Sequence, residues 1–329
     1  MKEDRVLLSH GGGGEEMSEL IDNMIFKAFD SEILEQRNDA AILENLAFTT
    51  DSYVVTPLFF SGGDIGKIAA CGTINDLAMV GAMAKYLSCS LIIEEGFLIS
   101  YLKIILNSMA QVCRENCVKI VCGDTKVVPK GKCDGLFINT SGIGEIYKSP
   151  IKTENLEVGA KVLLSGDIAR HGSVIMAARD EINMSSNLKS DSKSLKPVVK
   201  ALLDEGVIPL AMRDATRGGV SAVLNEWASF NGVEILVKER DIKISNEVAG
   251  ICELLGFEPY DLANEGTFVL AVKPQDEEKA CEILKSFDSN AGQIGEITNR
   301  LKGRVILENI YGVTRFLEPP KGELLPRIC

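Results

Sequence analysis

The sequence predicts a mixed α/β (α+β) protein of two domains with a flexible C-terminal arm. Strand and helix patterns alternate in the second half, and 329 residues are enough for two hydrophobic cores. Pro150 and the polar stretch 152–157 indicate a domain boundary. The last eleven residues hold three prolines and one glycine, which disfavour both helix and central strand. We therefore expect domains at 1–150 and 151–312 and an arm at 313–329.

The composition excludes several functions. A net charge of −12 argues against nucleic acid and anionic membranes as partners. The nine cysteines form no CxxC pair and only two histidines accompany them, so we expect neither zinc nor an iron–sulfur cluster. The charged start predicts no signal peptide, and no apolar run is long enough to span a membrane. Free thiols then favour the cytoplasm.

The first elements surround a glycine run. Four glycines, Gly11, Gly12, Gly13 and Gly14, precede a helix pattern over 15–29. Their backbone N–H groups could bind a phosphate at the start of this helix, or they could form a flexible linker. A strand is expected over 40–48, followed by Asp51, and a second strand over 53–56. Asp64 is expected to cap a helix over 65–80.

The 65–80 helix is rich in small residues and has the polar pair Asn75 and Asp76 at its middle. Buried polar groups need partners, so Asp76 is either a satisfied core carboxylate or a contact to metal or ligand. A helix over 97–115 and a buried strand over 118–122 follow, and this strand ends just before Asp124. A long strand over 136–146 carries Gly142.

The second half repeats the alternation. Strands are expected at 161–164, 233–237 and 267–272, with short ones near 293, 305 and 313. Helices are expected at 172–182, 195–204, 220–230, 246–255 and 276–286. The serine-rich stretch 183–196 between two of these helices predicts a mobile loop.

Acidic residues indicate a metal–phosphate site. Asp51, Asp124 and Asp214 lie beside Ser, Thr or Gly where strands end or loops begin, although Asp is also common in ordinary turns. Several carboxylates near a glycine run suit Mg²⁺ bridging to phosphate, with Lys126 and Arg217 as candidate phosphate cations. Neither a Walker A motif nor a GxGxxG unit between strand and helix is present.

The arm ends in the thiol of Cys329. Thiolates are good nucleophiles and carriers of acyl-type groups. The arm is therefore either a swinging carrier or a frayed tail with a chance cysteine.

Seven motifs spread over the whole chain resemble the carbamoyl dehydratase family of hydrogenase maturation, HypE. They are residues 10–14, 62–66, 75–78, 123–128, 213–219, 264–266 and the terminal 326–329, and the last distinguishes HypE from the other members of its superfamily. That superfamily includes aminoimidazole ribonucleotide synthetase and selenophosphate synthetase. Ser61 and Ala215 stand where the family more often has proline, which affects loop rigidity rather than a reactive group.

The resemblance implies an aminoimidazole ribonucleotide synthetase-like fold and a homodimer whose N-terminal sheets form a shared barrel. ATP is expected near that interface, with Mg²⁺ held by Asp51, Asp76 and Asp124. The residues expected to bind the nucleotide are Gly11, Gly12, Gly13, Gly14, Asp64, Gly142, Asp214, Arg217 and Asn264.

The resemblance also implies a reaction. A HypF-like carbamoyltransferase would load Cys329, and this chain would use ATP to dehydrate the S-carboxamide to an S-thiocyanate. The cyanide would pass to iron on a HypC–HypD-like scaffold. Glu265 or Lys126 would remove the protons from nitrogen. Two alternatives are another ATP enzyme of the superfamily acting on a free small substrate, and a non-enzymatic metal-handling scaffold.

Overall fold

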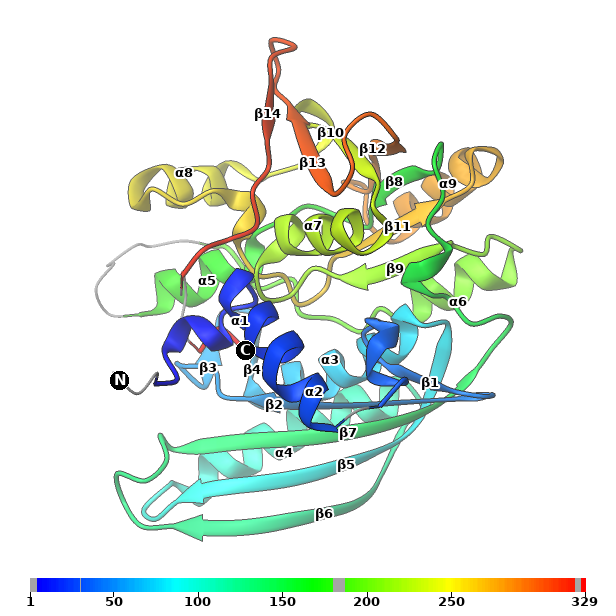
Figure 1. Cartoon of the computed structure of the whole chain (residues 1–329). Coiled ribbons are helices and arrows are strands. Elements are labelled where there is room, and N and C mark those ends of the chain that lie inside the picture. Colours follow the sequence, from blue (N-terminus) through cyan, green and yellow to red (C-terminus); the bar gives the residue numbers. More distant parts are fainter. Residues whose placement is uncertain (1–4, 30, 180–186, 323–326) are drawn as a thin grey trace.

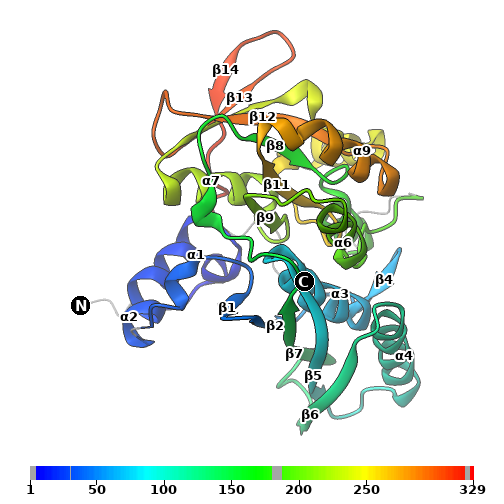
Figure 2. The ribbon, with the colours of Figure 1, turned by 90° about the vertical axis from the view of Figure 1, so that its right-hand side faces the viewer.

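Two β-sheets with helices packed against them form the molecule (Figures 1 and 2). The computed structural model describes residues 5–29, 31–179, 187–322 and 327–329. The mixed α/β class predicted from the sequence is confirmed. The domain boundaries drawn at 150 and 312 stay a prediction.

The first sheet has five strands in the order β1-β2-β7-β5-β6. Their bounds are Ala41–Leu43, Leu46–Tyr53, Leu136–Ile146, Ala82–Glu94 and Lys119–Val128, in that order. Only β5 and β6 pair in parallel. Helices α3 (Ile65–Met79) and α4 (Ile99–Glu115) supply the buried side chains that complete the core beside this sheet.

Helix α3 lies between the two sheets. It contacts β2, β7 and β5 on one side and β9 (Ala211–Asp214) and α6 (Lys196–Asp204) on the other. The Asp64 carboxylate accepts hydrogen bonds from the N–H groups of Gly66 and Lys67 at 2.8 and 3.0 Å, which confirms the expected N-cap. A Cβ at Gly66 would lie 2.2 Å from the Ile105 carbonyl oxygen, so only glycine lets α4 approach this closely.

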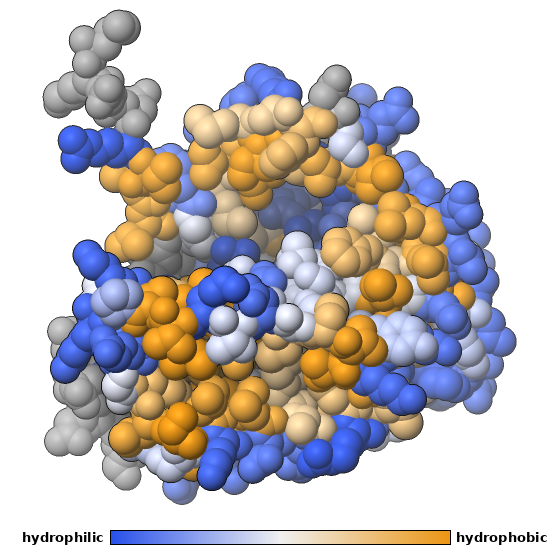
Figure 3. Space-filling model, turned by 90° about the horizontal axis from the view of Figure 1, so that it is seen from below, coloured by the Kyte–Doolittle hydropathy of each residue, from blue (hydrophilic) through white to orange (hydrophobic). Residues whose placement is uncertain are grey.

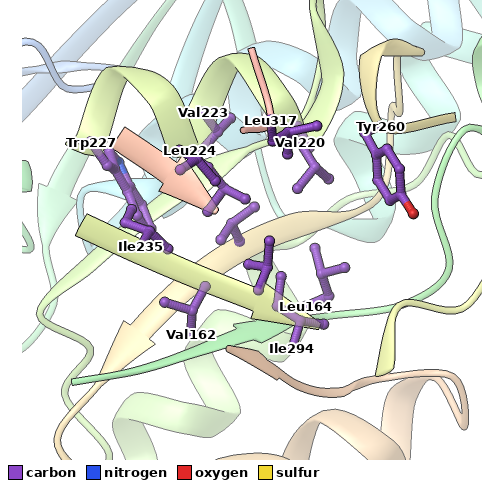
Figure 4. Close-up of a cluster of buried hydrophobic side chains, with 14 of the residues drawn as sticks. Val162, Leu164, Val220, Val223, Leu224, Trp227, Ile235, Tyr260, Ile294 and Leu317 are labelled. Atoms are coloured by element: carbon purple, nitrogen blue, oxygen red, sulfur yellow. The ribbon is translucent and has the colours of Figure 1, made fainter. Parts of the chain in front are cut away.

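The second sheet has seven strands in the order β14-β13-β10-β12-β8-β11-β9. Before β9 these are Thr314–Phe316, Arg304–Glu308, Glu234–Lys238, Gly292–Thr298, Lys161–Leu164 and Phe268–Val272. Helix α7 (Gly219–Asn231) packs Leu224 and Trp227 against Val162 and Ile235 (Figure 4). Helices α6 and α9 (Glu277–Phe287) contribute to a second core with Leu163. Helices α5 (Arg170–Ala178) and α8 (Asn246–Leu255) contact each other.

An N-terminal helical segment covers the junction of the two sheets. It comprises the 3-10 turn η1 (Leu8–Gly11), α1 (Glu15–Leu20), the π-turn η2 (Ile21–Ile25), α2 (Phe26–Phe29) and the 3-10 turn η3 (Leu34–Gln36). The remaining short elements are β3 (Phe59–Phe60), β4 (Gly63–Asp64), η4 (Thr153–Asn155), η5 (Glu239–Asp241), η6 (Pro259–Asp261) and η7 (Pro274–Asp276).

Three expected strands differ from the structure, and two observed strands of the two large sheets were not expected. The strand expected over 40–48 is a hairpin of β1 and β2, so Asp51 lies inside β2, and of the strand expected over 53–56 only Tyr53 is in a strand. The strand expected to be buried, 118–122, is part of β6, which runs through Asp124 and is exposed along almost its whole length. Strands β5 and β9 had no counterpart in the prediction.

The loop before α6 also differs from the prediction of a mobile segment. Ser190, Asp191 and Ser192 are buried. The Asp191 carboxylate accepts hydrogen bonds from the backbone N–H groups of Glu265 and Gly266. Residues 183–186 of that loop and the expected end of the 172–182 helix lie outside the described residues.

Candidate active site

A cavity of about 230 Å³ lies between the N-terminal segment and the junction of the sheets. Its charged lining comes from distant parts of the chain and comprises Asp39, Asp51, Asp76, Arg213, Asp214, Arg217 and Glu226. Gly13 and Met17 of the N-terminal segment close one side. The fold therefore brings Asp51, Asp76, Asp214 and Arg217 together, as expected, and adds three charged groups. We call this space the acidic cavity.

Burial sets the charge state of these carboxylates. Burial raises the pKa of Asp76 well above its ordinary value, and the nearby Asp51 and Asp214 raise it further. One hydrogen bond, 2.7 Å from the Thr49 hydroxyl, opposes this effect. Burial likewise raises the pKa of Asp214, with Asp39 and Asp51 adding to the effect. A bound cation would stabilise the ionised form of Asp76 and Asp214, because few positive charges lie close to these carboxylates.

Arg213 supplies part of that compensation. Its Nε lies 2.9 Å from an oxygen of Asp39, and its Nη1 lies 3.0 Å from Glu226. Burial still raises the pKa of Asp39 to about 6. Asp39 and Glu226 were missed because neither lies in a recognisable motif, whereas Arg213 opens the quoted 213–219 motif but was given no role.

The chemistry of the acidic cavity suits Mg²⁺ bound together with phosphate. Among the described residues, no three His, Cys, Asp or Glu side chains are arranged to hold a metal ion by themselves. Mg²⁺ is normally held by one or two carboxylates, with waters and substrate phosphates completing six ligands. Asp51 and Asp76 fit that partial set. They would also need the cation, because acidic groups otherwise repel a triphosphate.

A second, smaller cavity of about 80 Å³ holds the tip of the C-terminal arm, and we call it the thiol cavity. Gly11, Gly12, Arg217 and Asp261 line it together with Ile328 and Cys329. Arg217 lines both cavities, so they adjoin. The arm expected to be flexible therefore ends inside the protein, where backbone and side-chain hydrogen bonds hold residues 327–329.

Electrostatic interactions link Cys329 to charged groups around this junction. Burial raises the pKa of the Cys329 thiol to about 12, Glu265 and Asp51 add to this effect, and Arg217 opposes it. Glu265 is 3% exposed, and burial raises its pKa well above the usual range, with Asp214 the next cause. The pKa values of the Cys329 thiol and of the Glu265 carboxyl are therefore both raised in this part of the protein.

Asp124 and Lys126 lie elsewhere, on edge strand β6. Their side chains are 59% and 66% exposed and form an ion pair at 2.8 Å. Lys126 lowers the pKa of Asp124. Neither residue lines either cavity within this chain.

The other expected nucleotide residues make structural contacts. Asn264 accepts a hydrogen bond from Ala169 N–H at 2.7 Å and donates one to the Ala215 carbonyl at 2.8 Å. A Cβ at Gly142 would lie 2.7 Å from Thr73 Cγ2 of α3. Asp64 caps α3 and Gly14 contacts Pro320, so a role in nucleotide binding for these four residues stays a prediction.

Comparison with known proteins identifies the class. The family model described as AIR synthase related protein, N-terminal domain, matches residues 37–146. The model for the C-terminal domain of the same proteins matches residues 157–308. The fold is thus that of an AIR synthase related protein. A thiamine monophosphate kinase structure, AaThiL with AMPPCP and TMP, shares this fold at 19% identity and a TM-score of 0.72.

Closer relatives narrow the class. "Carbamoyl dehydratase HypE" of Escherichia coli K12 is 42% identical over 338 residues, covering 99% of this chain and 100% of the relative. A HypE from a HypE–HypF complex has a TM-score of 0.88 at 43% identity, covering 92% of this chain and 99% of the other. HypE in complex with ATP has a TM-score of 0.84 at 38% identity, covering 99% and 100%. The chain belongs to the HypE family of carbamoyl dehydratases and is an enzyme.

No helix within the described ranges has the length and apolar character needed to cross a bilayer.

Proposed function

We propose that this chain uses Mg²⁺ and ATP to dehydrate an S-carboxamide on Cys329 to an S-thiocyanate. The cyanide would become a ligand of iron in [NiFe]-hydrogenase maturation. The observation that carries this proposal is the position of the Cys329 thiol in a cavity that shares Arg217 with the acidic cavity, near enough to Glu265 for that carboxylate to raise the pKa of the thiol. The names of the relatives and the ATP complex of one of them support it.

The reaction removes one oxygen and two protons from the amide. When bound, Mg²⁺ and ATP supply a γ-phosphoryl group that converts the amide oxygen into a leaving group, so the products are thiocyanate, ADP and phosphate. Asp51 and Asp76 hold the cation. Glu265 accepts a proton from the amide nitrogen, and its raised pKa makes its ionised form a strong base. Ile328 and the N-terminal segment exclude water.

Lys126 and Asp124 reach an active site only if another molecule covers β6. Large apolar side chains are exposed on the strands of the first sheet, namely Phe48, Tyr86, Ile92, Ile120, Val121, Val127 and Ile143. Figure 3 shows hydrophobic residues gathered on this side of the molecule, around a hollow with hydrophilic walls. We propose a homodimer joined through these sheets, in which β6 brings Asp124 to the metal and Lys126 to the substrate of the other copy.

Loading of the thiol requires a partner. The related HypE in a complex with HypF supports a HypF-like carbamoyltransferase as that partner, and a HypC–HypD-like complex would accept the cyanide. Because Cys329 lies in the thiol cavity, the arm must leave this position to be loaded and return for dehydration.

Replacing Glu265 by Gln tests the chemistry. We expect Glu265→Gln to bind Mg-ATP and to accumulate the carbamoylated arm, because the amide has the same shape but accepts no proton at this pH. Intact mass distinguishes the species: carbamoylation adds about 43 Da and dehydration then removes about 18 Da. The assay contains the carbamoyltransferase, carbamoyl phosphate and ATP.

Glu234→Gln is the matched control, since Glu234 is equally buried but lies in the second sheet, bonded to Thr298. It should form the dehydrated product. A near-native yield of that product from Glu265→Gln would exclude Glu265 as the base and leave Lys126. Loss of ATP binding would instead assign Glu265 to the nucleotide site.

A further inference from the structure

The last three residues pair with the backbone that follows β2. Val54 N–H donates to the Cys329 carbonyl at 2.9 Å, and Thr56 N–H donates to the Arg327 carbonyl at 3.2 Å. The donors at residues 54 and 56 therefore bind the acceptors at residues 329 and 327, so the two segments run in opposite directions. These two bonds hold the end of the arm along the backbone that follows β2, and the chain turns at Arg327, whose φ is 55°.

Side chains of α5 and of the residue that follows it also bind carbonyl groups of the arm. His171, fully buried in α5, lies with Nε2 2.9 Å from the Ile328 carbonyl and Nδ1 2.8 Å from the Ser190 hydroxyl. A carbonyl only accepts, so Nε2 carries the hydrogen. Arg179 donates to the Arg327 carbonyl at 3.0 Å and to the Thr56 carbonyl at 3.1 Å.

Two side chains of the arm give this pairing selectivity. Ile328 is 5% exposed and packs in a hydrophobic cluster with Phe60, Val174 and Ile175. The guanidinium of Arg327 donates to the Val54 carbonyl at 2.8 Å, pairs with Asp134, and lies 5.5 Å from the ring centroid of Phe137. The C-terminus accordingly lies beside β3 and β4 (Figure 1).

The groove that binds the arm is held by contacts that do not involve the arm. Ser190 N–H donates to the Ser61 carbonyl at 2.9 Å, and Ser192 N–H donates to the Ser190 hydroxyl at 3.1 Å. Together they fix the hydroxyl that orients His171. Without the arm, the donors of Val54 and His171 would lose their partners at a partly buried site, which is unfavourable.

We propose that residues 54–56, His171, Arg179 and the Phe60–Val174–Ile175 pocket form a peptide-binding site specific for the C-terminal segment Arg-Ile-Cys. It binds the arm of its own chain. When that arm is displaced, it binds the same segment supplied in trans, as a free peptide or as the arm of another molecule. The covalent connection contributes local concentration, and the groove contributes the recognition.

Displacing the arm in the full-length chain tests this proposal. Ile328→Asp would place a charge in the apolar pocket and so free the groove. The probe is a fluorescently labelled peptide with the sequence of residues 323–329, kept reduced. It is titrated by anisotropy in the presence of Mg²⁺ and a non-hydrolysable ATP analogue. We expect saturable binding to Ile328→Asp and at least tenfold weaker binding to the unmodified chain, whose own arm competes at about millimolar effective concentration.

Matched changes test specificity. The same peptide with Asp in place of its isoleucine should bind at least tenfold more weakly. His171→Ala added to Ile328→Asp should weaken binding at least tenfold. If His171→Ala lowers the melting temperature markedly, Arg179→Gln replaces it, with the exposed Arg240→Gln as control.

Site-resolved alkylation of Cys329, read from the C-terminal peptide by mass spectrometry, provides a second measurement. The rate should be at least tenfold higher in Ile328→Asp than in the unmodified chain. The proposal is overturned if folded Ile328→Asp shows no saturable peptide binding, if both peptides bind equally, or if Cys329 of the unmodified chain reacts as fast as the free peptide. These readouts involve no dehydration, so they are independent of the proposed catalysis.

Discussion

The acidic cavity and strand β6 carry the same residue types in opposite surroundings. Asp76 and Asp214 are enclosed beside other carboxylates, and burial raises the pKa of both. Asp124 lies on an exposed edge, where Lys126 lowers its pKa. The first environment makes a cation favourable and excludes water. The exposed edge at β6 neither favours a cation nor excludes water unless another surface covers it. Asp124 and Lys126 can therefore join the site at the acidic cavity only if β6 acts on a second molecule.

The largest effect is expected at the thiol cavity. Cys329→Ala removes the only proposed attachment point, so product should fall to background in the intact-mass assay. The melting temperature should change by a few degrees at most, because only one sulfur atom is lost. Cys281→Ala, a half-buried thiol on α9, is the control and should retain activity. If Cys329→Ala still forms thiocyanate, the carbamoyl group must be attached to a residue other than Cys329.

Within the acidic cavity, Asp76→Asn should lower ATP-dependent turnover about 100-fold, a typical result of removing one charged group that stabilises a transition state. Asn keeps the volume but is a weaker Mg²⁺ ligand. Asp241→Asn, at an exposed turn of the second domain, serves as the control. Near-native turnover of Asp76→Asn would remove this carboxylate from the metal site.

Mixing two inactive variants tests the proposed role of β6 directly. Lys126→Met and Glu265→Gln should each be inactive alone. A mixed dimer would hold one site with both residues intact, so random mixing should restore about a quarter of the activity. Native mass spectrometry verifies that mixed dimers form. If they form without activity, β6 does not act across the interface.

The acidic cavity should also control the pH dependence of stability without Mg²⁺. Burial raises the folded-state pKa of Asp39 to about 6 and raises that of Asp76 and Asp214 above the value in the unfolded chain. The folded state therefore holds more protons, and stability falls as pH rises through these values. We expect the melting temperature to decrease from pH 5 to pH 8.

The double variant Asp76→Asn/Asp214→Asn should show a flatter slope, since two titrating groups are gone. His171, whose pKa burial lowers, contributes the opposite sign in both proteins and cancels from the comparison. An unchanged slope would show that these two carboxylates are ionised in the folded protein over this range.

The smallest effect is expected at Gly142, which lies in the first sheet away from both cavities. Gly142→Ala would bring a methyl group 2.7 Å from Thr73 Cγ2, and overpacking of this kind costs about 1–3 kcal/mol of stability. ATP affinity, measured by calorimetry, should be unchanged. A large loss of affinity without loss of stability would return Gly142 to the nucleotide site.

Local signals predicted the elements that depend on local chemistry. Asp64 capped its helix as expected, and α8 has the expected bounds, 246–255, because Ser245 and Gly256 mark its ends. Pairing between distant segments was harder to predict. The hairpin turn that precedes Asp51 contains Glu44 at φ 58° instead of the glycine that would signal it.

Exposure and long-range contacts caused the other errors. The apolar residues of β6 are typical of a buried strand, and the sequence does not reveal that they are exposed in the folded chain. The polar loop at Ser190 is typical of a mobile segment, yet it is buried because Glu265 and Gly266 donate to Asp191. The arm has proline-rich composition, and only the folded groove shows where it ends.

The half-buried position of Cys329 in the thiol cavity also affects its reaction with oxidants. Because the pKa of this thiol is raised to about 12, very little of it is ionised at pH 7 in the docked arm, and peroxides attack the thiolate form. The docked arm is therefore a storage form of the nucleophile. Oxidation of Cys329 to sulfenic acid should increase with the time that the arm spends outside the protein. When the loading partner is scarce, the arm stays docked and Cys329 should remain reduced.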